Sequence, residues 1–468
     1  MMGLHSKQEE LWCEPVNLAR RIPENHPLRQ LQQVLDLSFV HQEVSGCYGR
    51  NGNVSVDPVI VLKMMLLLFW DNVSSERELM RVIPLRIDYL WFLGYSLEDE
   101  VPNHSVLSKA RKRWGGELFA KLFGRVVQQC FDAGLVDGSK LHADSSLIRA
   151  NASLNSVVQI TLAKLEEDDE RSGESSGKKS AGGPVNRKYV AQTDPDARMV
   201  RHHAGKALPS YKNHRLVDDK KGVVTVSQTT HGVIDDGAHL PSLLAEHQAR
   251  VSREVRTVVA DARYGTNANF IALAQSGIES HLADLRRTQH NHHAEGIYPA
   301  EVFAYDAASD IYQCPAGQQL YRHHFHHQRG YHEYRTKSGV CAACPLQEQC
   351  TRSKTGRSIN RYPEQELLDQ AREQSHSEAA KLDRKRRQWF QERNFAEAST
   401  QHGYKRARWR GLWRQTIQDQ IIATLQNLKI LIRNTSGEVQ KALLELWNVL
   451  TTLRTMPVLL TSPEGHIY

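Results

Sequence analysis

The sequence predicts an α/β protein, and three observations support this class. Apolar residues recur with the helical period in three segments of the first third of the chain, residues 57–70, 75–95 and 104–132. The pattern then changes, because residues 139–148 alternate as in a strand and residues 211–232 indicate two strands joined by the turn DDKKG. A helix at 240–250 and a buried strand at 255–261 follow. This alternation of strands and helices indicates an α/β core.

The composition is that of an ordinary globular protein. Of the 468 residues 24% are charged and 40% hydrophobic, and the length suggests more than one domain. The first residues, MMGLHSKQEELWCEP, lack the apolar stretch of a secretion signal. The longest apolar run, Val59 to Trp70, is too short to cross a bilayer. We therefore expect a cytoplasmic protein without a membrane partner, whose seven cysteines are thiols or metal ligands.

Within an N-terminal region of residues 1–135, apolar patterns predict that residues 26–135 are mostly helical. Pro58, Pro84 and Pro102 mark boundaries between its helices. The stretch VPNHSVLSKARKRWG, residues 101–115, predicts a short helix with four cations, capped by Asn103 or Ser105. This helix fits the DNA-contacting helix of a helix-turn-helix, and it fits a basic surface helix equally well.

Two aspartates stand at predicted strands. Asp144 lies inside SKLHADSSLI, and Asp261 ends the strand in VVADARYGT. Aspartate is disfavoured in strands and is seldom buried without a partner. Asp261 therefore either starts a turn or belongs to a ligand or metal site at a strand end. A helix at 155–168 and a polar, glycine-rich linker at 170–184 are expected between the two aspartates.

Residues 286–362 are rich in cysteine and histidine. Four of the seven cysteines lie here, Cys314, Cys341, Cys344 and Cys350. A Cys-x2-Cys pair with two further cysteines is typical of a structural zinc site, although four unrelated thiols would give the same pattern. Four histidines, His323, His324, His326 and His327, either supply a zinc ligand or lie at the surface.

Positive charge is concentrated in the last quarter of the chain. Residues 381–414 contain eleven Lys or Arg and three acids, a net charge of +8, whereas the whole chain carries +7. Five aromatic residues are interleaved with these cations, Trp389, Phe390, Tyr404, Trp409 and Trp413. Cations mixed with aromatic rings suit phosphate contact and base stacking, although a solvated helix face is the ordinary alternative. Further helices are expected at 414–433 and 438–453.

Glu392 lies on this basic helix, in RKRRQWFQERNFAEAS. Alone it would be read as a solvated residue. Together with Asp144 and Asp261 it forms a set of hard oxygen ligands, which can hold two Mg²⁺ or Mn²⁺ ions about 3.5 to 4 Å apart. Ions so placed clamp the attacking and leaving oxygens of a phosphodiester, and they compensate the mutual repulsion of the carboxylates.

Between about residue 26 and residue 433 the sequence resembles the bacterial insertion-sequence transposases of the DDE type. It is similar to the group whose third acid lies in a Tyr-x2-Arg-x3-Glu-x6-Lys signature. The stretches that carry the resemblance are LHADSSLIRANAS (141–153), TDPDARM (193–199), VVADARYGT (258–266), CPAG, CAACPL and ERNFAEASTQHGYKRARWRGL (392–412).

The resemblance implies an RNase H-like core, a mixed sheet flanked by helices, divided between residues 136–285 and 363–455. Residues 286–362 would be an insertion, and the N-terminal helices would help to bind transposon ends. The first, second and third acids would be Asp144, Asp261 and Glu392, binding two Mg²⁺ or Mn²⁺ ions. The implied reaction is metal-dependent cleavage at the ends of the element, followed by attack of the freed 3′-hydroxyl on target DNA. Joining two ends further implies a homodimer on DNA.

The chain departs from the family in one important place, because Ser399 stands where the resemblance predicts a lysine that contacts DNA. Glu397 is a rival third acid, but Glu392 keeps the following residues in register. The cations expected to contact the DNA backbone are Arg263, Arg387, Arg393, Lys405, Arg406, Arg408 and Arg410. Two alternatives to a transposase remain, a non-catalytic DNA-binding protein derived from one and a metal-dependent nuclease of the same fold.

Overall fold

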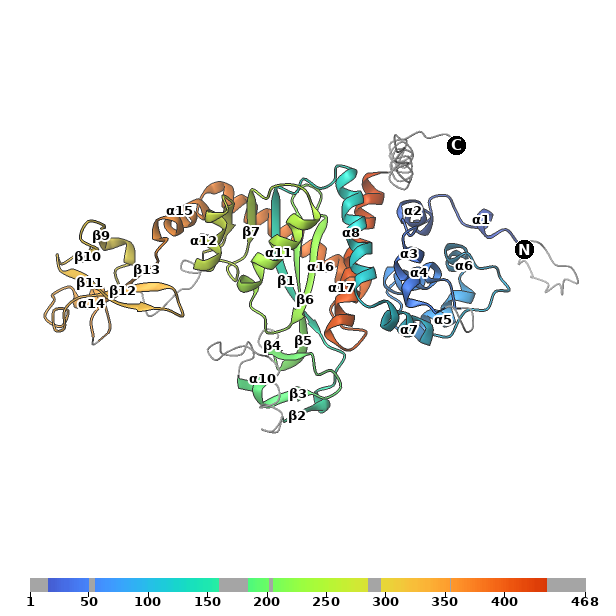
Figure 1. Cartoon of the computed structure of the whole chain (residues 1–468), viewed down its shortest axis with the longest axis horizontal. Coiled ribbons are helices and arrows are strands. Elements are labelled where there is room, and N and C mark those ends of the chain that lie inside the picture. Colours follow the sequence, from blue (N-terminus) through green and yellow to red (C-terminus); the bar gives the residue numbers. More distant parts are fainter. Residues whose placement is uncertain are drawn as a thin grey trace, which may run out of the picture. The chain divides into compact units, whose positions relative to one another are not determined.

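The computed structural model describes residues 16–49, 55–159, 184–201, 205–284, 296–353 and 355–435 (Figure 1). Its chain divides into two compact units. The first unit comprises Met1–Ile234, Ser242–Glu254 and Trp389–Tyr468, and the second comprises Asp235–Pro241 and Val255–Gln388. Antiparallel strands, a parallel strand pair and many helices occur among the described residues, which confirms the predicted α/β class.

Helices make up the N-terminal part of the first unit. In order they are α1 (Leu18–Arg21), α2 (Pro27–Val34), α3 (Val40–Val44), η1 (Ser45–Cys47), α4 (Pro58–Trp70), α5 (Glu76–Val82), η2 (Ile83–Leu85), α6 (Ile87–Leu93), α7 (Ser105–Trp114) and α8 (Glu117–Asp132). Helix α4 starts with Pro58 after the cap Asp57, whose carboxylate accepts a hydrogen bond from Val59 N at 2.7 Å. The helical pattern expected over 104–132 comprises two helices, which are divided at Gly115 with its positive φ of 67°.

The sheet of the first unit is centred on β5 (Ala207–Asp218). One edge of β5 pairs antiparallel with β1 (Lys140–Arg149), and the other pairs first with β4 (Arg198–Arg201) and then with β6 (Val224–His231). The expected hairpin at 211–232 is therefore confirmed. Short strands β2 (Val157–Gln159) and β3 (Tyr189–Ala191) form a separate pair, close to the short helices η3 (Leu154–Ser156) and α10 (Pro184–Lys188) in sequence.

The helix predicted at 155–168 is wrong over its described part. Residues 157–159 form strand β2, in which Val157 and Val158 pair with β3. Two adjacent β-branched residues favour a strand once a pairing partner is present, and that partner lies more than 30 positions away in the sequence. The rest of this segment, most of the linker at 170–184 and the helix at 438–453 lie outside the described residues.

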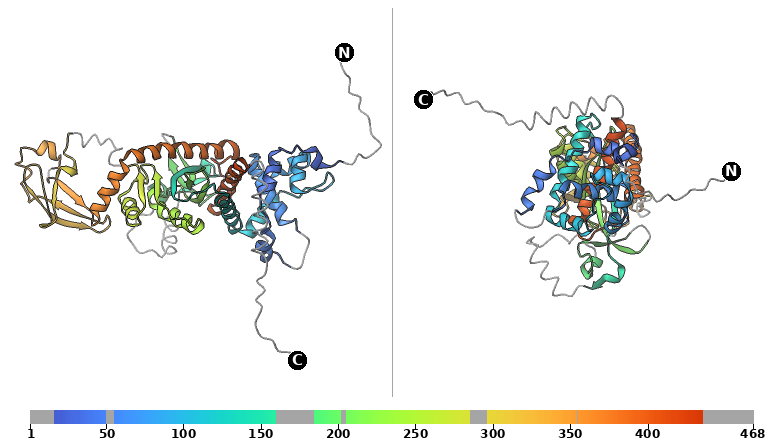
Figure 2. Two further views of the ribbon diagram at one scale, coloured as in Figure 1. Left: turned by 90° about the horizontal axis from the view of Figure 1, so that it is seen from above. Right: turned by 90° about the vertical axis from the view of Figure 1, so that its right-hand side faces the viewer.

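Three longer helices complete the architecture, α11 (Asp236–Arg250), α16 (Glu378–His402) and α17 (Leu412–Asn434). Figure 2 shows α16 as one long unbroken helix. Helix α17 packs against α8 and β6. The TDPDARM stretch holds the start of α17, because the carboxylates of Asp194 and Asp196 accept hydrogen bonds from Gly411 N and Leu412 N, both at 2.9 Å.

The second unit contains a parallel pair of strands, β7 (Thr257–Ala260) and β8 (Glu279–Leu282). Helices α12 (Asn267–Gln275) and α15 (Gln365–Ser375) pack beside β8 and against each other. A separate five-stranded antiparallel sheet has the order β13 (Ser358–Arg361), β12 (Tyr331–Arg335), β11 (Gln319–His326), β10 (Ile311–Gln313) and β9 (Ala304–Asp306), with the short helices η4 (Ala300–Val302) and α14 (Gln347–Cys350) nearby in sequence. None of the helices in the described part of the chain is long and apolar enough to span a membrane.

Candidate active site and cysteine cluster

Asp144 lies in the middle of β1, where its partner across the ladder is Arg215 of β5. Directly opposite residues of an antiparallel pair point to the same face of a sheet, and so do alternate residues of one strand. Asp144 therefore shares a face with Arg215, and with His142 and Ser146 of its own strand. Asp144 is partly exposed on this face, and its carboxylate accepts a hydrogen bond from Ser145 N at 2.8 Å.

Helix α16 covers this face of β1. The side-chain amide of Gln391 donates to the carbonyl of His142 at 2.8 Å, and the ring of Phe390 stacks on the imidazole of His142 with centroids 5.4 Å apart. Glu392 follows immediately and is exposed. Two of the three predicted acids, Asp144 and Glu392, are thus brought to one region of the first unit.

The contact between β5 and α16 is made by Arg215, which is fully buried. Its guanidinium donates to three side-chain amide oxygens, those of Asn213 at 2.8 Å, Asn394 at 2.6 Å and Gln426 at 2.9 Å. The rings of Phe395 and Tyr404 lie 5.1 and 4.6 Å from it. A buried guanidinium requires such partners, so this network fixes α16 on the sheet. The sequence analysis missed Arg215, although an arginine inside the strand NHRLVD was a usable signal.

Glu397 has a different environment from Glu392. Five residues along a helix correspond to a rotation of about 140°, so the two carboxylates lie on different flanks of α16. The carboxylate of Glu397 is 3.8 Å from the ammonium of Lys429 and 3.7 Å from the guanidinium of Arg433, both on α17, and its side chain is 13% exposed. Glu397 therefore contributes to the packing of α16 against α17, whereas Glu392 is accessible from solvent.

The segment after α16 returns to the end of β1. Arg149 N donates to the carbonyl of Lys405 at 3.0 Å, and Ala407 N donates to the carbonyl of Arg149 at 2.8 Å. These bonds make a parallel bridge between Arg149 and Arg406. Lys405 consequently lies beside β1, where its ammonium donates to Ser146 Oγ at 2.5 Å.

Among the predicted DNA-contacting cations of the first unit, four are exposed, Arg393, Lys405, Arg406 and Arg410. Arg408 is engaged internally. Its guanidinium donates to the side chain of Asn72 at 2.6 Å and to the carbonyl of Val73, and it lies 4.7 Å from the ring of Phe69. Burial lowers the pKa of Arg408 to about 10. These contacts hold the loop after α16 on the N-terminal helices, so the guanidinium of Arg408 serves packing within the first unit.

The basic helix expected at 101–115 is α7, and Asn103 accepts a hydrogen bond from Ser105 N at its start. Its cations are not equivalent. Lys109, Lys112 and Arg113 are exposed, whereas Arg111 is 3% exposed and forms an ion pair with Glu76. The guanidinium of Arg111 also lies 3.8 Å from the ring of Trp409. Arg111 and Trp409 therefore serve packing within the first unit.

Asp261 follows β7 in the second unit. Its carboxylate accepts a hydrogen bond from Arg263 N at 3.0 Å, and its carbonyl accepts one from Tyr264 N at 3.1 Å. The turn that the sequence indicated is therefore present, and Asp261 remains partly exposed. Gly265 completes this turn, because a Cβ there would lie only 2.0 Å from the carbonyl oxygen of Ala283.

Asp261 lines a groove of about 440 Å³ within the second unit. The first half of α16 contributes most of the other polar lining residues, Glu378, Lys381, Arg384, Lys385, Arg387 and Gln388. The predicted cation Arg263 lies in the turn after Asp261, with a side chain 71% exposed and 3.4 Å from the carboxylate of Asp236. A carboxylate in a groove rich in cations suits a site for a phosphate-bearing ligand.

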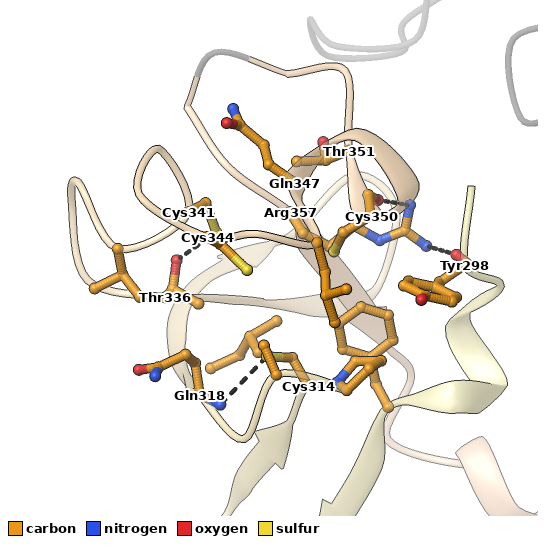
Figure 3. Close-up of a pocket in the computed structure, with 16 residues that line it drawn as sticks. Tyr298, Cys314, Gln318, Thr336, Cys341, Cys344, Gln347, Cys350, Thr351 and Arg357 are labelled. Atoms are coloured by element: carbon orange, nitrogen blue, oxygen red, sulfur yellow. Dashed lines mark hydrogen bonds between the residues drawn. The ribbon is translucent and has the colours of Figure 1, made fainter. Parts of the chain in front are cut away.

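The four cysteines of residues 286–362 line one pocket (Figure 3). Cys314 lies in a tight turn after β10, Cys341 and Cys344 in the loop after β12, and Cys350 at the end of α14. The sulfur of Cys314 accepts a hydrogen bond from Gln318 N at 3.3 Å. Burial raises the pKa of the Cys350 thiol, the nearby Arg357 opposes this, and the other three cysteines add to it.

No histidine is among the described residues that line this pocket. Of the four predicted candidates, His323, His324 and His327 are exposed on or near β11, and His326 lies 3.3 Å from the carboxylate of Glu333. Within the described parts of the chain, no group of three or more His, Cys, Asp or Glu side chains is arranged so that it could hold a metal ion as it stands. The four thiols nevertheless form the soft donor set that suits zinc.

Comparison with known proteins finds two transposase family models that each match part of the chain. The family model "Transposase domain (DUF772)" matches residues 16–113, and the model "Transposase DDE domain" matches residues 313–432. The resemblance to DDE-type transposases is thereby confirmed. No curated protein matches the sequence. Among solved structures, the chain is similar to a piggyBac transposase in a synaptic complex with hairpin DNA, at 12% identity over 95% of this chain and 85% of that one. The TM-score of 0.33 is too low for that likeness to carry an argument.

Proposed function

We propose that this protein is the DNA transposase of an insertion sequence, with an RNase H-like core and the catalytic acids Asp144, Asp261 and Glu392. The observation that carries the proposal is the match of a transposase DDE domain to residues 313–432, which include Glu392. Further support comes from the contact between β1 and α16, which joins the neighbourhoods of Asp144 and Glu392. Asp261 adds an accessible carboxylate at the end of a strand, in a basic groove.

The three carboxylates are proposed to hold two Mg²⁺ or Mn²⁺ ions. Their oxygen atoms are the ligand type that these ions prefer, and Asp144, Asp261 and Glu392 are all at least partly exposed. Such ions, when bound, supply charge stabilisation for the attacking and leaving oxygens of a phosphodiester. The protein contributes orientation, since Arg215 fixes the helix that carries Glu392 against the strand that carries Asp144.

DNA is the proposed substrate, held by cations that are exposed or, in the case of Arg387, partly exposed. Those in the proposal are Arg263, Arg387, Arg393, Lys405, Arg406 and Arg410. Contacts with about six phosphates would lower the affinity for DNA roughly a thousandfold between 50 and 200 mM salt. We propose that the helices of residues 1–135 help to bind the ends of the element. Residues 136–285 and 363–455 would form the core and residues 286–362 an insertion, and a homodimer would join two ends in the cytoplasm.

A metal-dependent cleavage assay tests this function. The substrate is a duplex taken from the DNA that flanks the gene, incubated with protein and Mg²⁺ or Mn²⁺. We expect cleavage by the native protein, and loss of cleavage with retained DNA binding in Asp144→Ala, Asp261→Ala and Glu392→Ala. Glu397→Ala is the matched control and should still cleave. Activity in the Glu392 variant with loss in the Glu397 variant would reverse the assignment of the third acid.

The same assay separates the alternatives. Binding of the duplex without any metal-dependent cleavage would favour a non-catalytic DNA-binding protein. Cleavage without joining of the freed end to a target duplex would favour a nuclease of the same fold. Ser399, which replaces the expected lysine, makes these controls necessary.

We also propose that Cys314, Cys341, Cys344 and Cys350 bind one structural zinc ion. Support comes from the single pocket that all four line and from the turn at Cys314, whose sulfur accepts a backbone hydrogen bond as a thiolate ligand would. Deprotonated thiols in this pocket would repel one another, and a cation would compensate that charge. The role is structural, since the apolar residues Phe303 and Leu320 beside the pocket form a small core.

Metal analysis of the purified protein tests this site. We expect about one zinc per chain, lost in the double variant Cys341→Ser/Cys344→Ser and retained in the control Cys47→Ser, which changes an exposed cysteine outside the pocket. A native protein without zinc, or a double variant that keeps it, would remove the proposal.

A further inference from the structure

Among the predicted DNA-contacting cations, Lys405 has an ammonium that is held beside the strand of a proposed catalytic acid, Asp144. Its ammonium is held by Ser146 Oγ at 2.5 Å, two residues along β1 from Asp144 and on the same face of the strand. Burial lowers the pKa of Lys405, the positive charge of Arg215 adds to this, and the negative charge of Asp144 opposes it. Lys405 nevertheless remains exposed, so an anion from solvent can reach it.

The backbone holds Lys405 in this place. The segment Lys405–Ala407 runs beside the end of β1, where Arg406 forms the parallel bridge and the residues on either side of it hydrogen-bond to Arg149. The ammonium of Lys405 reaches Ser146 of β1, whereas Arg406 is exposed.

The ammonium of Lys405 also lies over a side chain of α16, the ring of Phe395. It is 5.9 Å from the centroid of the Phe395 ring, and Phe395 is three residues, or about one turn, after Glu392. Ser399 lies one further turn along this flank. Its hydroxyl donates to the carbonyl of Phe395 at 2.6 Å, which turns it back onto the helix.

We propose that Lys405 contacts the reacting phosphate of the DNA, in the position that Ser399 leaves without a cation. This inference rests on the proposed function, and it sets Lys405 apart from the cations that only bind the DNA backbone. In the absence of DNA, Ser146 holds the ammonium next to Asp144. On binding, the same ammonium donates to a non-bridging oxygen of the phosphate and stabilises the negative charge that develops there.

The first experiment measures single-turnover cleavage of the flanking duplex with protein in excess. We expect Lys405→Ala to lower the cleavage rate roughly a hundredfold, as loss of one preorganised donor does, while the affinity for DNA falls less than about tenfold. Lys405→Arg should recover part of the rate, because it keeps the charge. Lys221→Ala removes an exposed lysine of the β5–β6 turn and should cleave at the native rate.

A second experiment separates phosphate contact from a structural role. Binding is measured without metal ions to two duplexes, one of them carrying a neutral methylphosphonate at the cleavage position. The native protein should bind the neutral duplex less tightly, and Lys405→Ala should bind both equally. Adding Ser399→Lys to Lys405→Ala should restore part of the rate, since position 399 lies on the flank of α16 that carries Glu392.

The outcomes are distinguishable. Cleavage by Lys405→Ala at the native rate, or an equal preference for the charged duplex in both proteins, overturns the role of Lys405 and leaves the proposed function intact. Absence of metal-dependent cleavage by the native protein overturns the proposed function and this inference with it. Circular dichroism of the variants checks that each one is folded.

Discussion

Arg215 stands directly opposite Asp144 in the β1–β5 ladder, and its guanidinium donates to Asn394, two residues beyond Glu392 on α16. A single buried cation thus connects the strand of one proposed catalytic acid with the helix of another. Two further hydrogen bonds, from Nε and Nη1, go to the amide oxygens of Asn213 on β5 and Gln426 on α17. The spacing of Asp144 and Glu392 therefore depends on the hydrogen bonds that Arg215 donates.

Replacement of Arg215 is expected to destabilise the first unit. It should also lower cleavage activity, because Arg215 holds the helix that carries Glu392 against the strand that carries Asp144. Arg215→Met leaves the buried amide oxygens of Asn394 and Gln426 without a donor, at about 1 to 3 kcal/mol each. Asn213 Oδ1, in contrast, keeps its hydrogen bond from the Tyr404 hydroxyl. We expect the free energy of unfolding to fall by roughly 3 kcal/mol or more, measured by urea denaturation. Arg215→Lys should recover little, because one ammonium cannot reach partners on β5, α16 and α17 together. Arg406→Ala, a change at an exposed arginine, is the stability control, and an equal loss there would contradict this account.

Substitutions of the two glutamates of α16 should affect different properties, stability for Glu397 and metal-dependent cleavage for Glu392. Glu397→Gln removes the charge that faces Lys429 and Arg433, so we expect the free energy of unfolding to fall by about 1 kcal/mol. Glu392→Gln should leave stability unchanged within about 0.5 kcal/mol, because Glu392 is exposed, and should abolish metal-dependent cleavage. Thermal unfolding and cleavage measured on the same two preparations check this, and the reverse pattern would exchange the roles of the two residues.

Local patterns predicted the elements that carry Asp144 and Asp261, but not the surroundings of these residues. The strand at 139–148, the hairpin at 211–232 and the strand at 255–261 follow from alternation and turn residues, and all three are present. Helix α17 was also predicted, at 414–433. These elements are specified by residues that are close in the sequence.

What sequence patterns could not predict depends on contacts between distant residues. Arg408 was expected at a DNA surface, but its partners Asn72 and Val73 lie more than 330 positions away. The choice between Glu392 and Glu397 was open in the sequence, and the difference in their surroundings arises from α17. The buried polar residues of α17 follow the same rule, since their partners lie on β5, β6 and α16.

Trp389 is expected to stack on a DNA base. It is 55% exposed on α16, three residues before Glu392, and the guanidinium of Arg393 lies 5.2 Å from its ring. Stacking of one base is worth about 1 to 3 kcal/mol, so Trp389→Ala should weaken binding of a fluorescent single strand about tenfold. Trp389→Phe should retain most of the affinity. Fluorescence anisotropy measures both, with Leu85→Ala as the control for loss of an exposed apolar side chain. Equal affinity of the native and alanine proteins would exclude the stacking role.

We expect the free energy of unfolding to depend on pH because of Asp419. It is fully buried on α17, where Thr229 Oγ1 donates to it at 2.6 Å and Gln415 Nε2 at 2.8 Å. Burial raises its pKa from 3.8 to about 7, so the folded protein holds a proton there that the unfolded chain has released. Because the pKa of Asp419 is higher in the folded protein than in the unfolded chain, its contribution to the free energy of unfolding is fully present below about pH 4. That contribution is lost as the pH rises to about 7.

Asp419→Asn isolates this effect, because it keeps the shape and removes the titration. The difference in unfolding free energy between the variant and the native protein should increase in favour of the variant between pH 4 and pH 7, by up to about 4 kcal/mol, and stay constant above. Two buried histidines, His247 and His402, have pKa values lowered to about 4, so they oppose Asp419 in this window. Their contribution is the same in both proteins and cancels in the difference. Urea denaturation at several pH values measures it, and a difference that does not change with pH would show that Asp419 is ionised in the folded protein throughout.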